Sequence, residues 1–194
     1  MNKLTRDELY SLEKYAEARP QFRARVMAHK TNRRLPIGAH ATLYFEDRLT
    51  IQYQVQEMLR AERIFEAEGI EEELAAYNPL IPDGSNWKAT FMLEYDDEAE
   101  RRKALAGLIG VEVRVWLQVA GFERVTPVAD EDLERSDEDK TSSVHFLRFE
   151  LSAGMVRALK GGAGLSAGID HDHYRQVVDP VPENVRRALV QDLD

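Results

Sequence analysis

The residues best suited to chemistry lie in a glycine-flanked segment near the C-terminal end, Asp170-His171-Asp172-His173. Imidazole nitrogen together with carboxylate oxygen suits zinc, iron or manganese. Because neighbouring side chains on an extended chain point to opposite sides, only the two histidines or the two aspartates would face one ion. The alternatives are a turn rich in solvated polar groups and acid–base chemistry by one histidine.

Two further histidines and a glutamate are candidate metal ligands. His145 falls on the apolar face of a predicted strand, where a hydrogen-bonded core histidine is the simpler interpretation, and His40 falls on the polar face of another strand. Convergence of His40, His145 and either His171 or His173 would make a three-histidine site. Glu62 is predicted to lie near the centre of an apolar helix stripe, where a buried carboxylate must be paired, hydrogen-bonded, metal-bound or protonated.

The polar face of the same helix is a candidate pocket lining. It carries Arg48, Gln56, Glu57 and Arg60. A wetted surface is the alternative interpretation. The glycine-rich run 161–168 lacks the Gly-Lys-Ser/Thr ending of a P-loop and is interpreted as a helix cap followed by a flexible loop.

Composition excludes several classes of chemistry. The 194 residues include no cysteine, so disulfides, thiolate metal sites and cysteine nucleophiles are excluded. A net charge of -9 argues against nucleic-acid binding, which needs a basic surface. No window approaches the roughly 18 apolar residues of a membrane-spanning helix, and the N-terminal sequence lacks a signal-peptide core. We therefore expect a cytoplasmic protein without membrane insertion.

Charge is unevenly distributed along the chain. Residues 1–34 contain nine Lys/Arg and four Asp/Glu, whereas the rest of the chain is acidic. The basic helices either pack near the acidic remainder or dock an acidic partner or anionic ligand. The basic stretch consists of Arg19, Arg23, Arg25, Lys30, Arg33 and Arg34.

Apolar periodicity predicts the elements that must position these residues. Strands with one polar face favour an α+β fold, with a mainly antiparallel sheet of about five strands and helices packed on it. We expect a single domain over 1–194 with a helical N-terminal part of about 1–35. The predicted helices are about 6–18, 20–33, 47–68, 71–77, 97–109, 153–160 and 182–193, and the strands 39–45, 87–95, 111–119, 123–128 and 143–151.

Five segments carry a resemblance to a known family. They are 4–9, 46–64, 77–84, 144–149, and 170–171 with 179–180. Together they resemble a bacterial family classified only as a domain of unknown function. Its members are often encoded beside a rubrerythrin and an iron-sulfur oxidoreductase similar to the heterodisulfide reductase type. The resemblance thus implies a redox or peroxide-defence context and supplies no catalytic residues.

The chain contains no complete catalytic motif. We therefore predict an accessory or binding protein for an iron-sulfur or non-haem iron redox system, with the oxidoreductase or the rubrerythrin as partner. The alternative is a metal-dependent enzyme or metal-binding protein with a small-molecule site in the helix–sheet crevice. Binding of an anionic cofactor such as a flavin or nucleotide is a third hypothesis.

Overall fold

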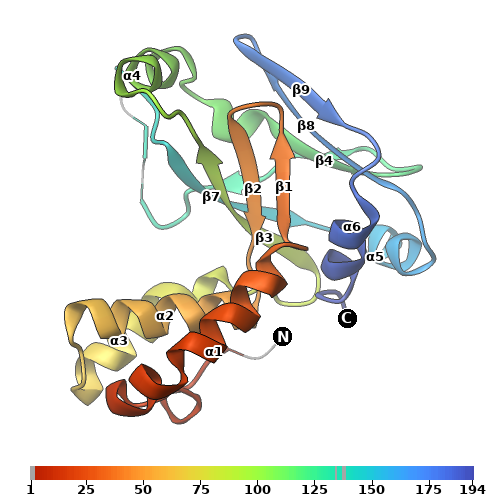
Figure 1. Cartoon of the computed structure of the whole chain (residues 1–194). Helices are drawn as coiled ribbons and strands as arrows, with labels where there is room; N and C mark the ends of the chain where they lie inside the picture. The colour runs from red at the N-terminus through yellow and green to blue at the C-terminus, as the bar shows by residue number, and fades with distance from the viewer. Residues whose placement is uncertain (1–2, 134, 137–138) are drawn as a thin grey trace.

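The structure is a computed structural model that describes residues 3–133, 135–136 and 139–194. Its helices and strands alternate irregularly along the chain (Figure 1). The α-helices are α1 (Leu12–Lys30), α2 (Arg48–Glu62), α3 (Ala67–Tyr77), α4 (Glu98–Gly107), α5 (Ala153–Lys160) and α6 (Glu183–Val190), with 3-10 turns η1 (Arg6–Glu8), η2 (Asn78–Leu80) and η3 (Val111–Arg114). The strands are β1 (Arg34–Ile37), β2 (Ala41–Phe45), β3 (Asn86–Leu93), β4 (Val115–Val119), β5 (Arg124–Val125), β6 (Val128–Ala129), β7 (Val144–Glu150), β8 (Leu165–His171) and β9 (Tyr174–Val178).

The strands form two antiparallel sheets. One has the order β1-β2-β3-β7-β6 and the other β5-β4-β8-β9. A single apolar cluster contains buried side chains from both sheets, among them Phe91 and Phe149 from the first and Leu117 and Ile169 from the second. The α+β class with an antiparallel five-stranded sheet and a helical N-terminus is confirmed. In the second sheet, β4 and β5 lie within the predicted strands 111–119 and 123–128, whereas β8 and β9 were not predicted.

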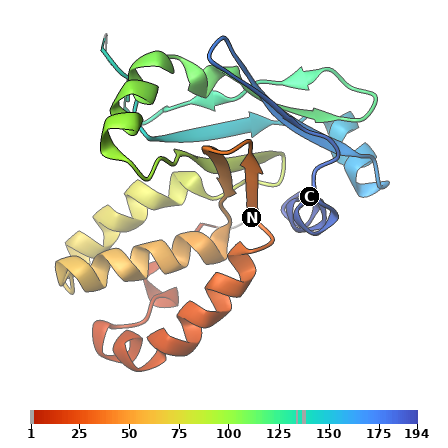
Figure 2. The same ribbon diagram turned by 45° about the horizontal axis from the view of Figure 1, so that its top comes forward.

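Helices α1, α2 and α3 form a separate layer beside the five-stranded sheet (Figures 1 and 2). Ile51, Val55 and Leu59 recur along one face of α2 and are buried against Leu74 of α3. Tyr15, Phe22 and Val26 form a third buried cluster on α1. The layer therefore has apolar contacts of its own, distinct from the core between the sheets.

Pro20 does not begin a new helix as predicted, but lies inside α1. Proline in a helix interior removes one backbone hydrogen bond. The helix continues because Tyr15 and Phe22, on either side of Pro20, are buried on the same face and pack edge-to-face. Tertiary packing here outweighs the local cost of the proline.

Helix α2 ends earlier than predicted, which changes the surroundings of Glu62. Arg63 adopts a left-handed conformation with φ of 58° and terminates the helix. Phe65 consequently lies beyond α2 and is 71% exposed. Glu62 is exposed as well, so its predicted burial in the apolar stripe is wrong.

The glycine-rich segment is not a flexible loop, because residues 165–171 form β8 and pair with β4 and β9. Gly168 lies opposite Trp116, so closely that a Cβ atom at this position would overlap the indole ring. Glycine is thus required here by close packing within a strand.

In the predicted strand 111–119, only Val115–Val119 is extended, since η3 occupies the first four residues.

A buried guanidinium connects the helical layer to the sheet and the C-terminal segment. Arg33 is 3% exposed and donates from Nε to the Phe45 carbonyl and from Nη2 to the Glu46 carbonyl, at 3.0 and 3.1 Å. It also forms a bidentate ion pair with the buried carboxylate of Asp192. Nη1 lies 3.4 Å from Asp47, the N-cap residue of α2. Four segments therefore meet at one side chain.

Replacement of Arg33 by Met should destabilise the protein by about 3–5 kcal/mol, because Asp192 would stay buried without its partner. Urea unfolding at neutral pH measures the difference. Arg102→Met is the matched control, since the Arg102–Glu98 pair is 79% and 75% exposed and its loss should cost less than about 1 kcal/mol. Equal stability of the two variants would contradict a central role for Arg33.

Candidate functional site

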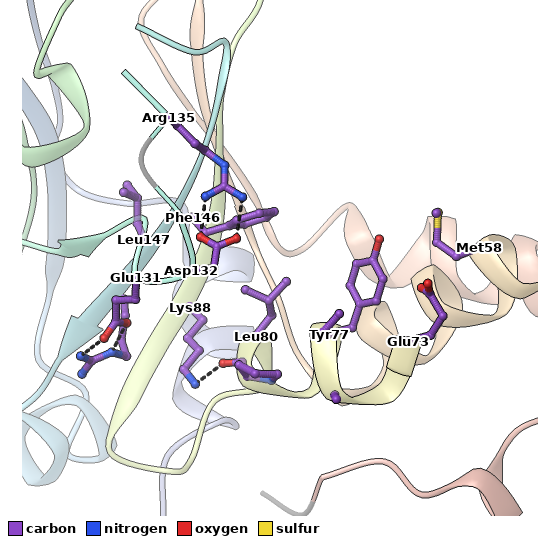
Figure 3. A pocket seen from close by; sticks show the side chains of 14 residues that line it. Met58, Glu73, Tyr77, Leu80, Lys88, Glu131, Asp132, Arg135, Phe146 and Leu147 are labelled. Atoms are coloured by element: carbon purple, nitrogen blue, oxygen red, sulfur yellow. Dashed lines mark hydrogen bonds and ion pairs between the residues drawn. The ribbon is translucent and has the colours of Figure 1, made fainter. Parts of the chain in front are cut away.

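A cavity of about 600 Å³ lies between the helical layer and the outer face of the five-stranded sheet (Figure 3). The sheet contributes neighbouring side chains from β3 and β7, where Lys88 pairs in register with Arg148. Phe146 lies on the same outer face of β7, and Pro79 and Leu80 come from η2. The side chains that alternate with these on β3 and β7 point into the core between the sheets.

The helices supply the opposite wall. Met58 comes from α2, whereas Glu73, Ala76 and Tyr77 come from α3. Figure 3 shows Glu73 next to Tyr77 and Met58, on the side of the cavity away from Glu131. The walls are therefore mainly apolar and aromatic, with charged groups at separate positions.

Most of the charges that line the cavity are paired with one another. Glu131 binds Arg148 through both carboxylate oxygens, at 2.7 Å each. Asp132 binds Arg135, whose guanidinium carbon lies 4.5 Å from the centre of the Phe146 ring. Bidentate pairs of this kind have fixed geometry, so they shape the wall.

Two charged groups of the lining differ from these pairs. Among the described residues, no carboxylate lies within 4.0 Å of the Lys88 ammonium group, which donates a hydrogen bond to the Pro79 carbonyl at 2.5 Å. Burial lowers the pKa of Lys88. Glu73 has a buried Oε2 with no hydrogen-bond partner in the described part of the chain. Burial raises the pKa of Glu73, with Glu62 and Glu72 acting in the same direction. Perturbed groups in a cavity mark candidate functional sites.

The four predicted pocket residues of α2 lie elsewhere. Gln56 is buried and binds the backbone of Tyr10 through both ends of its carboxamide. Glu57 accepts hydrogen bonds from Arg19 and from Tyr15 of α1, while Arg48 pairs with Glu8. Arg60 is exposed. None of these side chains lines the 600 Å³ cavity; three of them attach α2 to the N-terminal segment.

His145 is a fully buried core histidine. Its Nδ1 lies 2.6 Å from Asp130 and its Nε2 lies 2.9 Å from the Thr141 hydroxyl. A carboxylate oxygen of Glu112 lies 4.0 Å from the same Nε2. Both ring nitrogens are thus engaged inside the protein.

The other candidate histidines lie at one end of the two sheets. His40 stacks on Tyr95 with ring centres 4.2 Å apart. Tyr95 and His173 line a smaller hollow of about 340 Å³. The rings of His171 and His173 are 5.8 Å apart, and Nε2 of His171 faces the Ile109 carbonyl.

Within the described residues, no three histidine, aspartate or glutamate side chains are grouped so that they could hold a metal ion. His145 has its own partners inside the protein, His40 stacks on Tyr95, and His173 lines a hollow to which Tyr95 also contributes. Glu62 is an exposed residue at the end of α2. Binding of iron, zinc or manganese by a smaller set of these side chains stays a prediction.

Sequence reasoning missed the residues that line the cavity. Lys88 and Arg148 sit on the polar faces of correctly predicted strands, and the alternation was the available signal. Glu73 stands in a run of three glutamates, and nothing in the sequence sets it apart from Glu71 or Glu72.

No described helix is both long and apolar enough to cross a membrane.

The fold and the cavity define an α+β protein with two antiparallel sheets and a helix–sheet pocket. The chain belongs to the family described as Protein of unknown function (DUF3501), whose model matches residues 3–193. The crystal structure of a novel protein of unknown function from Burkholderia pseudomallei is similar throughout. It has 53% sequence identity, a TM-score of 0.94 and coverage of 100% of both chains. No curated protein matches the chain. The predicted link to a redox partner stays a prediction.

The pair between Arg19 and Glu57 makes stability depend on pH. Hydrogen bonds from Arg19 and Tyr15 lower the pKa of Glu57 from 4.5 to about 2. In the unfolded chain the carboxyl group takes up its proton near pH 4.5, so the stabilisation is present above that pH and is lost as the pH falls toward about 2.

Glu57→Gln should therefore lower the free energy of unfolding by on the order of 1 kcal/mol near neutral pH, since the partly exposed pair is screened by water. The difference from wild type should shrink below about pH 4. Urea unfolding across this range measures it. The control is Glu17→Gln, at an exposed position of α1; a gap that persists undiminished at low pH would contradict the assignment.

Proposed function

We propose that this protein binds a small, mainly apolar molecule in the cavity between α3 and the outer face of β3 and β7. The observation that carries the proposal is the 600 Å³ cavity itself. Ligand pockets typically occupy about 300–1,000 Å³ and combine apolar walls with a few polar groups. The chain has this combination in Tyr77, Leu80 and Phe146 together with Glu73 and Lys88.

Close packing elsewhere in the molecule supports the proposal. Protein interiors contain few voids larger than a water molecule. The core between the two sheets is filled by large side chains such as Trp87, Phe91 and Phe149, each fully buried. The hollow lies outside this core, between the helical layer and the sheet, and its volume leaves room for a bound molecule.

Binding explains the charged groups more simply than catalysis does. Glu73 and Lys88 come from opposite walls, α3 and β3, and share no hydrogen bond. General acid–base catalysis needs a group within hydrogen-bond reach of the proton that it transfers. We assign Glu73 to orientation of one end of the ligand, and Lys88, which donates to the Pro79 carbonyl, to the wall of the cavity.

Filling the cavity should abolish binding. Ala76 lines the cavity and is exposed on α3, so Ala76→Trp places an indole in the binding space without disturbing a core. The neutral dye Nile red, whose fluorescence rises in apolar surroundings, reports occupancy. The wild-type protein should bind one Nile red molecule per chain in a saturable manner. Ala76→Trp should lower the affinity for Nile red by about tenfold or more, since the contacts of one apolar side chain are worth about 1.5–3 kcal/mol.

Ala61→Trp is the matched control, because Ala61 is an exposed residue of α2 that does not line the cavity. Urea midpoints should show that both variants fold like wild type. Absence of saturable binding by wild type, or equal binding by Ala76→Trp and wild type, would overturn the proposed function.

A further inference from the structure

One carboxylate oxygen of the cavity has no partner. Oε2 of Glu73 is shielded from solvent, and no described residue donates a hydrogen bond to it. Buried polar atoms in native proteins are hydrogen-bonded with few exceptions. Figure 3 places Glu73 beside the Tyr77 ring and Met58, at the helical end of the cavity. Oε2 itself is covered by the protein, whereas the half-buried Glu73 side chain as a whole lines the cavity, where a ligand can contact the rest of its carboxylate.

The charges around Glu73 favour a cation. Glu62 and Glu72 lie close enough to raise the pKa of Glu73, and no arginine or lysine among the described residues forms an ion pair with it. A positive group beside Glu73 would gain from all three carboxylates and donate a charge-assisted hydrogen bond to the accessible part of the Glu73 carboxylate. The neighbouring Tyr77 ring offers an apolar and aromatic surface for the adjoining part of the molecule.

The opposite end of the cavity is a poorer anion site than the presence of Lys88 suggests. Lys88 already donates to the Pro79 carbonyl. Asp83, Glu131 and Glu150 all act on it electrostatically. An incoming anion would meet three carboxylates around one lysine and one arginine, and the arginine is already paired with Glu131.

We infer that the ligand of this cavity carries a protonated amine that binds Glu73, and that its apolar body extends along Tyr77 and Leu80 toward Phe146. The inference rests on the proposed function and specifies its ligand class. Glu73 is the residue that distinguishes an amine from a neutral molecule of the same shape.

Competition against Nile red tests the inference with decylamine, decanol and decanoate, which share one chain length and differ in the head group. Wild type should bind the amine about tenfold or more tightly than the alcohol, as expected for a charge-assisted hydrogen bond. Glu73→Gln keeps the shape and removes the charge, so it should abolish this preference. Glu71→Gln, an exposed glutamate two residues away that does not line the cavity, should retain it.

The outcomes separate the inference from the proposed function. Equal affinity for amine and alcohol in wild type, a preference that survives in Glu73→Gln, or tighter binding of decanoate would overturn the amine assignment while leaving the cavity as a binding site. Failure of all three compounds and of Nile red to bind would overturn the proposed function itself.

Discussion

The buried guanidinium of Arg33 is the constraint on which the arrangement of the chain depends. A charge removed from water needs a full set of partners, and these come from β2, the start of α2 and the C-terminal segment. Burial alone would raise the pKa of Asp47, but Arg33, the Thr50 amide and His29 together lower it. Asp47 therefore caps α2 as an anion, and the direction in which α2 leaves the sheet is set by the same charges that hold Arg33.

The cavity follows from this arrangement. Helix α2 starts directly after β2, runs away from the sheet, and the chain returns through α3 and η2 to β3. The helices pack on each other through Val55, Leu59 and Leu74, so their apolar residues are largely satisfied within the layer. The outer face of β3 and β7 consequently borders the cavity near Phe146, whose ring is covered by the Arg135 guanidinium. The Glu131–Arg148 and Asp132–Arg135 ion pairs line the same cavity.

Local patterns predicted much of the fold but little of the site. Strict alternation of residue type located β2, β3 and β7, and in β3 and β7 this alternation corresponds to one buried face. The same alternation exists in β8 as Leu165, Ala167 and Ile169, yet the glycine-rich run 161–168 suggested a loop. Only the approach of Trp116 explains Gly168. The partners of Arg33 could not be predicted either, since Asp192 is 159 residues away in the chain. Contacts at such separations leave no trace in the periodicity of one sequence.

Glu73 shows why a binding residue can look ordinary in sequence. Three successive glutamates follow Ile70, and on a helix their side chains point in directions about 100° apart. Only the third lines the cavity, where burial and the neighbouring Glu62 and Glu72 raise the pKa of its carboxyl group. A neutral residue there would remove the repulsion among these carboxylates. A cation that enters the cavity reduces the same repulsion on binding, so the property that weakens the free protein is the one that strengthens the complex.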